Sequence, residues 1–130
     1  SIIGDGGFHM TFQELMLMKQ YNLPVKVFIF NNSYLGMVRQ WQELFHSRRY
    51  SSVDLSYNPD FIKIGEAYGI KSVQLKNSKD LKKNLKKILE SNEPVLVECI
   101  IEKEENVYPM IPAGKDVTQI VGKRGVLENE

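Results

Sequence analysis

The stretch that decides the fold is VKVFIFNN, residues 25–32. Residues 25–30 form a nearly continuous run of β-branched and aromatic side chains, which is typical of a strand buried on both faces. The run VLVECII at residues 95–101 has the same character, and residues 2–3 and 71–75 predict two shorter strands. Strands of this kind belong to parallel sheets covered by helices. The runs therefore predict an α/β fold, a parallel sheet with helices on both faces.

Two helices are predicted around this central strand. The pattern Thr11-x-x-Glu14 resembles a capping box, and it leads into the apolar residues 15–18. After the polar residues that end the strand, GMVRQWQELF at residues 36–45 predicts a second helix. A polar loop follows it.

Two further helices are predicted in the second half of the chain. Asn58 and Pro59 predict a helix start, with Asn as the N-cap and Pro at the first helical position, and Gly69 closes that helix. Ser78 is expected to cap a lysine-rich helix that ends before Pro94. Strands and helices then alternate along residues 1–103, which we interpret as one α/β domain, and residues 104–130 as a C-terminal tail that wraps over the surface.

Composition narrows the functional classes. The chain has 130 residues, 42% of them hydrophobic, and a net charge of +1, so it lacks the basic excess of a nucleic-acid-binding domain. The lysines at 79–87 alternate with apolar residues at helical spacing and are interpreted as a solvated helix face. A single cysteine, Cys99, allows no disulfide within the chain. There is neither a signal peptide nor an apolar run long enough for a membrane span, so we expect no membrane partner and a cytoplasmic location.

Polar residues follow two of the predicted strands. Gly4-Asp5-Gly6-Gly7 comes after the first strand, and Asn32 ends the strand at 25–30, 27 positions after Asp5. Ligands of parallel sheets bind at the carboxyl ends of strands, and neighbouring strands lie about 4.8 Å apart. Both side chains could then reach one Mg²⁺ ion, which prefers oxygen ligands, with the backbone carbonyl of Tyr34 as a third ligand.

Several alternatives compete with this site. The glycines do not match a dinucleotide fingerprint, because His9 stands where its third glycine would be, and a Walker Gly-Lys-Ser/Thr is missing near this turn. Gly4-Asp5-Gly6 by itself is also compatible with an ordinary tight turn. Met37, Trp41 and Phe45 repeat at helical spacing, which by pattern alone favours core packing.

The two strand ends together resemble the GDG…NN motif of thiamine diphosphate enzymes. The segment NLPVKVFIFNNSYLGMVRQWQELFHSRRYS, residues 22–51, is more specific and closely resembles the large catalytic subunits of the acetolactate synthase family. The likeness continues through NPDFIKIGEAYGI, PVLVECII and YPMIPAG, and it weakens after about residue 120.

The resemblance implies roles for individual residues. Asp5 and Asn32 would bind Mg²⁺ through their side chains and Tyr34 through its carbonyl. The tail at 104–130 would cover the active site. The residues expected to contact the cofactor are Gly4, Asp5, Gly6, Gly7, Asn32, Gly36 and Met37, and those expected at the substrate are Met37, Val38 and Trp41. The sequence departs from the family at Gly7, where Ser is common, and at His9, where Gln or Asn is common.

The resemblance also implies a larger parent enzyme, of which this chain would be a C-terminal piece that begins inside the diphosphate-binding domain. We expect it to be inactive alone, because the catalytic glutamate belongs to a domain that it does not contain. The parent would decarboxylate pyruvate on thiamine diphosphate and join the two-carbon unit to pyruvate or 2-ketobutyrate, in branched-chain amino acid biosynthesis. FAD would be held mainly by a middle domain. Expected partners are the N-terminal and middle domains, further copies in a homo-oligomer, and a regulatory small subunit if the parent has one.

Two other functions stay open at this point. One is a different thiamine diphosphate-dependent 2-ketoacid enzyme, and the other is a stand-alone, non-enzymatic binding module. The sequence does not distinguish a biosynthetic from a catabolic form.

Overall fold

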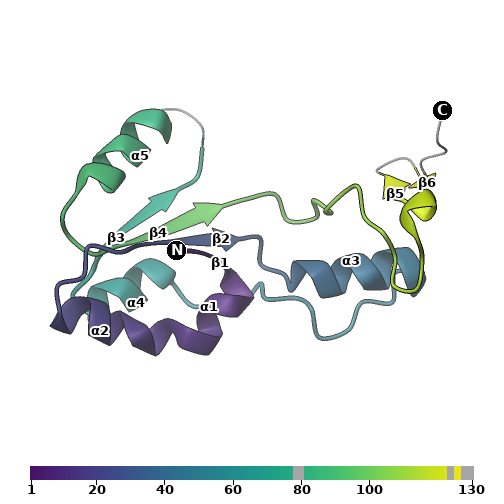
Figure 1. Cartoon of the computed structure of the whole chain (residues 1–130). Helices are drawn as coiled ribbons and strands as arrows, with labels where there is room; N and C mark the ends of the chain where they lie inside the picture. Colours follow the sequence, from purple (N-terminus) through teal and green to yellow (C-terminus); the bar gives the residue numbers. More distant parts are fainter. Residues whose placement is uncertain (78–80, 123–124, 127–130) are drawn as a thin grey trace.

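The computed structural model describes residues 1–77, 81–122 and 125–126 (Figure 1). Its centre is a parallel sheet, as the sequence predicts, in the order β1-β2-β4-β3. The strands are β1 (Ile2–Gly4), β2 (Lys26–Asn31), β3 (Lys71–Leu75) and β4 (Val95–Ile100). Pairing puts Gly4 beside Phe30, and Asn31 beside Ile100. The carboxyl ends of β1, β2 and β4 therefore lie together at the same end of the sheet.

Helices cover both faces of the sheet, which confirms the predicted fold class. The helices are α1 (Asp5–Thr11), the 3₁₀ turn η1 (Phe12–Glu14), α2 (Leu15–Gln20), α3 (Gly36–Phe45), α4 (Phe61–Ala67) and α5 (Leu81–Glu90). Figure 1 shows α1, α2 and α4 on one face and α5 on the other, while α3 projects beyond the strand ends. The chain moves in one direction across the sheet from β1 to β2 and β3 and then returns to β4, so crossovers of one hand place α5 opposite the earlier helices.

Two apolar clusters fill the space between these layers. The larger lies under α1, α2 and α4, where the rings of Phe8 and Phe61 meet edge to face at 5.4 Å. Phe61, Ile29 and Leu96 in this cluster are fully buried. The smaller lies under α5 and is made by Leu75, Ile88, Val95 and Val97. Burial of these side chains is the main favourable term that holds the helices on the sheet.

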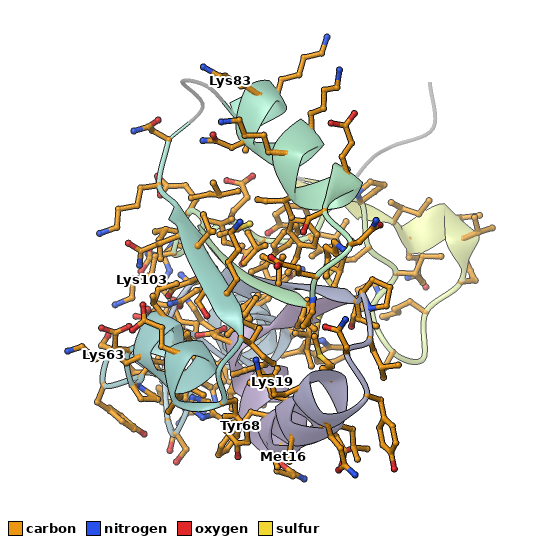
Figure 2. All side chains as sticks on the ribbon, turned by 90° about the vertical axis from the view of Figure 1, so that its left-hand side faces the viewer. Met16, Lys19, Lys63, Tyr68, Lys83 and Lys103 are labelled. Atoms are coloured by element: carbon orange, nitrogen blue, oxygen red, sulfur yellow. The ribbon has the colours of Figure 1, made fainter. Side chains whose placement is uncertain are left out.

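The α5 face of the sheet is only partly covered. Leu81, Leu85 and Leu89 of α5 border an apolar groove of about 600 Å³, whose floor includes Phe28 and Phe30 of β2. The lysines of α5 lie on its outer side, as the sequence predicts, and Figure 2 shows Lys83 pointing away from the sheet. In the described part of the chain, no helix has the length and hydrophobicity needed to cross a membrane.

The predicted start of the first helix is wrong. The helix begins at Asp5, directly after the extended residue Gly4, so Gly4-Asp5-Gly6-Gly7 forms its first turn. Thr11 instead marks the junction between α1 and η1, where its side chain makes no capping hydrogen bond. The capping-box pattern misled because the helical segment is longer than its apolar stretch and already contains Thr11.

The predicted N-cap at Asn58 is also wrong. Asp60 caps α4, and its carboxylate accepts hydrogen bonds from the backbone N–H groups of Ile62 and Lys63 at 3.0 and 3.1 Å. Asn58 is thereby free for another partner. Gly69, with a φ of +69°, follows the last turn of α4 as predicted. The predicted cap Ser78 lies outside the described residues.

The C-terminal segment leaves the sheet and passes along α3. It contains the 3₁₀ turn η2 (Val117–Gln119) and a short antiparallel pair, β5 (Val121–Gly122) with β6 (Gly125–Val126). Figure 1 shows this segment beside α3, beyond the strand ends. Whether it also covers the active site stays a prediction.

Candidate functional site

Asp5 is held at the end of β1 by the immediate start of α1. It is the first residue of the helix and is only 1% exposed. Its carboxylate oxygen Oδ2 accepts a hydrogen bond of 2.7 Å from the amide Nδ2 of Asn58, which comes from the loop before α4. A buried carboxylate needs such partners, because burial disfavours the charged form.

The glycines around Asp5 allow neighbouring side chains to approach the backbone closely. A Cβ on Gly6 would lie 2.5 Å from Leu35 Cδ2, so no side chain fits there without movement of Leu35. A Cβ on Gly36 would lie 3.1 Å from Asn32 Nδ2. At Gly7 it would lie 3.0 Å from Ile3 Cγ1, so the serine common in the resembling family would require a small shift of Ile3. Gly6 and Gly7 therefore let Leu35 and Ile3 pack close to the backbone, whereas a Cβ on Gly4 would meet nothing within 4 Å.

The end of β2 is shaped by a buried carboxylate in the neighbouring strand. Glu98 of β4 accepts hydrogen bonds from Asn31 Nδ2, at 2.7 Å, and from Gln74 Nε2 of β3. Asn31 Oδ1 in turn accepts from the backbone N–H of Ser33, at 3.0 Å, and Ser33 has a φ of +55°. This chain of hydrogen bonds across three strands turns the backbone sharply after Asn31.

Asn32 and Tyr34 lie in the turn that follows. Asn32 Oδ1 accepts a 3.1 Å hydrogen bond from the Tyr34 N–H. The turn is pinned to the loop at 53–55 by backbone hydrogen bonds on either side of Tyr34, both 2.9 Å long. Among the described residues, no backbone hydrogen bond reaches the Tyr34 carbonyl, which is left available to a ligand.

The loop is tied to the exit of β4 by a lysine. Lys103 Nζ lies 4.7 Å from the centre of the Tyr34 ring and donates to Ser56 Oγ at 3.0 Å. It also lies 4.0 Å from Asp54. Hydrogen bonds from the Ser56 side chain and backbone, with a smaller contribution from Lys103, lower the pKa of Asp54.

The structure brings the predicted metal and diphosphate residues together. A cleft of about 400 Å³ at the ends of β1 and β2 is lined by Gly4, Asp5, Gly6, Gly7, Asn32, Tyr34 and Gly36, among others. It offers one carboxylate, one amide oxygen and one free carbonyl. This oxygen donor set fits Mg²⁺, which is usually bound by one or two carboxylates together with phosphate oxygens and water. Among the described residues, no three His, Cys, Asp or Glu side chains gather as a metal site.

The predicted substrate residues lie on α3, outside this cleft. Met37 and Val38 are 53% and 49% exposed, and Phe45 is also exposed, so the alternative of core packing is wrong for this stripe. Trp41 is half-buried and contacts the Phe45 ring, with ring centres 5.1 Å apart. Val38 and Trp41 line a separate, shallow hollow with Gln42, His46 and Arg49.

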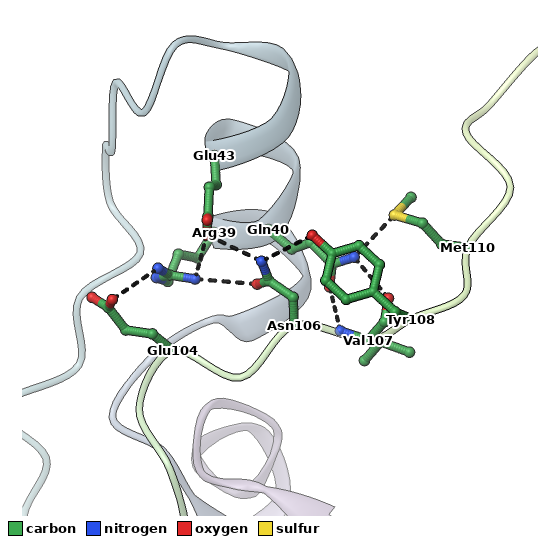
Figure 3. Close-up of polar contacts among 8 residues, drawn as sticks. All are labelled: Arg39, Gln40, Glu43, Glu104, Asn106, Val107, Tyr108 and Met110. Atoms are coloured by element: carbon green, nitrogen blue, oxygen red, sulfur yellow. Dashed lines mark hydrogen bonds and ion pairs between the residues drawn. The ribbon is translucent and has the colours of Figure 1, made fainter. Parts of the chain in front are cut away.

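The buried face of α3 is polar, which sequence reasoning missed. Arg39 and Gln40 are 4% and 1% exposed. Gln40 Nε2 donates to the Val107 carbonyl at 3.0 Å, and Gln40 Oε1 accepts from the Val107 N–H at 2.8 Å (Figure 3). The one signal in the sequence was a pair of polar residues, at 39 and 40, which stand between Met37 and Trp41 in the chain.

Arg39 gathers the remaining contacts of this face. Its guanidinium group forms ion pairs with Glu43 at 2.9 Å and Glu104 at 3.4 Å, and donates to Asn106 at 3.2 Å (Figure 3). The rings of Tyr34 and Tyr50 lie 5.4 and 5.3 Å from the guanidinium carbon, close enough for cation–π attraction. We call Arg39, Gln40, Glu43 and Asn106 the α3 anchor, because they attach the helix to the segment at 104–110.

Glycine backbone at a helix start and oxygen-bearing groups at adjoining strand ends are typical of α/β proteins that bind phosphorylated ligands at the carboxyl ends of their strands. Residues 1–99 match the family model described as thiamine pyrophosphate enzyme, C-terminal TPP binding domain. The chain belongs to this family.

Within this family, the chain is similar to acetolactate synthases. The acetolactate synthase large subunit of Lactococcus lactis subsp. lactis is 49% identical over 128 residues, which cover 98% of this chain and 22% of the relative. That of Cyanidium caldarium is 43% identical over 122 residues, covering 93% of this chain and 21% of the relative. The mitochondrial acetolactate synthase of Schizosaccharomyces pombe is 42% identical over 120 residues, or 92% of this chain and 18% of the relative. The chain therefore spans about a fifth of the length of these relatives.

Proposed function

We propose that this chain supplies the diphosphate- and metal-binding part of an acetolactate synthase large subunit. The observation that carries the proposal is the convergence of Asp5, Asn32 and the Tyr34 carbonyl on one glycine-lined cleft. The named relatives support it, because their similarity extends over nearly the whole chain.

In this proposal each residue has a distinct task. Asp5 and Asn32 hold Mg²⁺ with their side chain oxygens and Tyr34 with its carbonyl, while the N–H groups of Gly6 and Gly7 face the diphosphate. When bound, thiamine diphosphate supplies the electron sink for decarboxylation of a 2-ketoacid. The chain contributes position and charge, and the protonating glutamate is expected in a part of the parent that this chain does not contain.

The exposed apolar side of α3 fits a substrate role. Met37, Val38 and Trp41 present apolar surface outside the chain's own core. We propose that this surface lines the pocket for pyruvate and 2-ketobutyrate once the rest of the parent is present. FAD, the homo-oligomer and a regulatory small subunit belong to the same proposal, and they involve parts of the parent outside this chain.

A titration tests the site itself. The chain would be titrated with thiamine diphosphate by calorimetry, with Mg²⁺ and then with EDTA, and the series repeated on Asp5→Ala. We expect heat of binding only with Mg²⁺ and only with Asp5 present. Equal binding by Asp5→Ala would overturn the metal role of Asp5.

A chimera tests the reaction. The segment of this chain that matches the Lactococcus lactis large subunit, with 49% identity over 128 residues, would replace its counterpart in that protein. We expect the chimera to form acetolactate from pyruvate, and its Asp5→Ala variant to form none. A folded chimera that binds thiamine diphosphate but makes a different product would favour another thiamine diphosphate-dependent activity.

A further inference from the structure

Asn58 forms a hydrogen bond with only one of the two oxygens of the Asp5 carboxylate. Its amide Nδ2 donates to Oδ2 at 2.7 Å. In the part of the chain that the structure describes, Oδ1 has no hydrogen-bond partner, and Asp5 lines the cleft. One oxygen is therefore occupied within the protein, and the other is free for a ligand.

The orientation of the Asn58 amide follows from the chemistry of its two partners. A carboxylate can only accept, so the NH₂ group of Asn58 must face Asp5. The amide oxygen is then left to face His9 Nε2, at 2.8 Å, and that nitrogen must carry a proton in order to donate. His9, Asn58 and Asp5 form a hydrogen-bonded relay with one consistent direction.

The backbone around Asn58 is set up for this contact. Its N–H donates to the Leu55 carbonyl at 2.9 Å, and Asp60, rather than Asn58, caps α4. His9 is itself held against the ring of Phe61, with ring centres 5.5 Å apart. The amide is thus supported from both sides, although it lies 53 positions from Asp5.

The geometry points to Asn58 as a positioning residue that makes Asp5 a one-oxygen ligand and thereby favours Mg²⁺ over Ca²⁺. Mg²⁺ requires a tight octahedral shell, which favours a carboxylate bound through one oxygen, whereas Ca²⁺ accepts more ligands and can also bind a carboxylate through both oxygens. This inference rests on the proposed function, because it concerns the cation held by Asp5.

The experiment compares two cations on four variants. Mg²⁺ and Ca²⁺ would each be titrated into the chain with saturating thiamine diphosphate, with the fluorescence of Trp41, the only tryptophan, as readout. The variants are Asn58→Ala, Asn58→Gln, His9→Gln and His9→Leu. Asn92→Ala, an exposed position in the turn before β4, is the matched control. Thermal unfolding of each variant checks that it is folded.

We expect Asn58→Ala to weaken Mg²⁺ binding about 10-fold, in the range usual for partners of metal ligands. Ca²⁺ binding should fall less, because Asp5 gains a second free oxygen, so the Mg²⁺/Ca²⁺ preference drops. His9→Gln retains an N–H donor and should behave like the wild type, whereas His9→Leu should shift the preference in the same direction as Asn58→Ala. Asn58→Gln, if its longer amide reaches Oδ2, should restore part of the preference.

Two outcomes separate the inference from the proposed function. If Asn58→Ala binds both cations with an unchanged ratio while Asp5→Ala binds neither, the positioning role is overturned and the metal site stands. If the wild type and Asp5→Ala respond alike to Mg²⁺, the proposed site fails, and the role of Asn58 fails with it.

Discussion

Gln40 pairs with Val107 as one strand pairs with another. Its amide nitrogen donates to the Val107 carbonyl and its amide oxygen accepts from the Val107 N–H, at 3.0 and 2.8 Å. A side chain on α3 thus replaces a neighbouring strand for a segment that has left the sheet.

This pairing predicts how the C-terminal segment is released. Gln40→Leu preserves much of the volume but removes both hydrogen bonds to Val107, which are part-buried, at a cost of about 0.5–1.5 kcal/mol for each bond. We expect faster hydrogen exchange at the Val107 amide and earlier proteolysis of residues 101–120. Gln42→Leu, which removes a similar pair of hydrogen bonds to the Ser51 backbone, is the control. Unchanged exchange at Val107 would mean that the segment is held by other contacts.

The hydrogen bonds of Glu98 with Asn31 and Gln74 predict that a second substitution restores the stability lost by a first one. Glu98→Gln puts a second NH₂ group against one of its two amide donors and should lower the free energy of unfolding by about 1–3 kcal/mol. The double variant Glu98→Gln with Gln74→Glu restores one donor and one acceptor on each side, and moves the charge to the more exposed position 74. Chemical denaturation of the single and double variants measures the coupling. Additive losses would contradict this arrangement.

Cys99 predicts a pH dependence. Burial, and to a smaller degree the negative charge of Glu98, raise the pKa of the thiol. Since this is the only cysteine, iodoacetamide reports on it alone. The midpoint of the alkylation rate against pH should lie higher in the folded chain than in denaturant, where it is about 8.5.

The sign of the linked stability follows from the same shift. The folded state holds the thiol proton more tightly, so this contribution is present below the unfolded pKa and is lost as pH rises through the folded pKa. Compared with Cys99→Ala, the wild type should therefore lose stability as pH rises above about 8.5. A constant difference between the two proteins across that window would contradict the raised pKa.

Side-chain truncation should cost much more stability in the buried core than on the exposed side of α3. Phe61 is fully buried against Phe8, so Phe61→Ala should cost about 3–5 kcal/mol. Val38 is 49% exposed, and Val38→Ala should change stability by less than about 0.5 kcal/mol. Thermal and urea unfolding measure both. A large loss at Val38 would mean that this face of α3 packs on the chain after all.

The strands and the strand-end site could be predicted because their signals are local. Residues 25–30 and 95–101 are apolar at nearly every position, and a strand buried on both faces needs that pattern. Asp5 and Asn32 could be paired because parallel neighbours bring their carboxyl ends together. The convergence of these two residues on one cleft follows from that rule alone.

The helix starts and the role of Asn58 could not be predicted, since they depend on contacts far apart in the sequence. Asn58 has the chemistry of an N-cap, and so does Asp60; only the position of Asp5 decides which of the two caps α4. The α3 anchor escaped prediction for a related reason. A pattern of apolar residues indicates which side of a helix avoids water, but it does not say whether that side meets its own chain.

Helix α3 buries polar side chains and exposes apolar ones, so substitutions on its two sides have different consequences. The described polar contacts of the helix with the rest of its domain are made by Arg39, Gln40, Gln42 and Glu43, whereas Met37 and Val38 are about half exposed. Substitutions on the outer side can therefore alter what the helix contacts without a matching loss of folding. The outer side of α3 can therefore vary in sequence while the attachment of the helix stays constant.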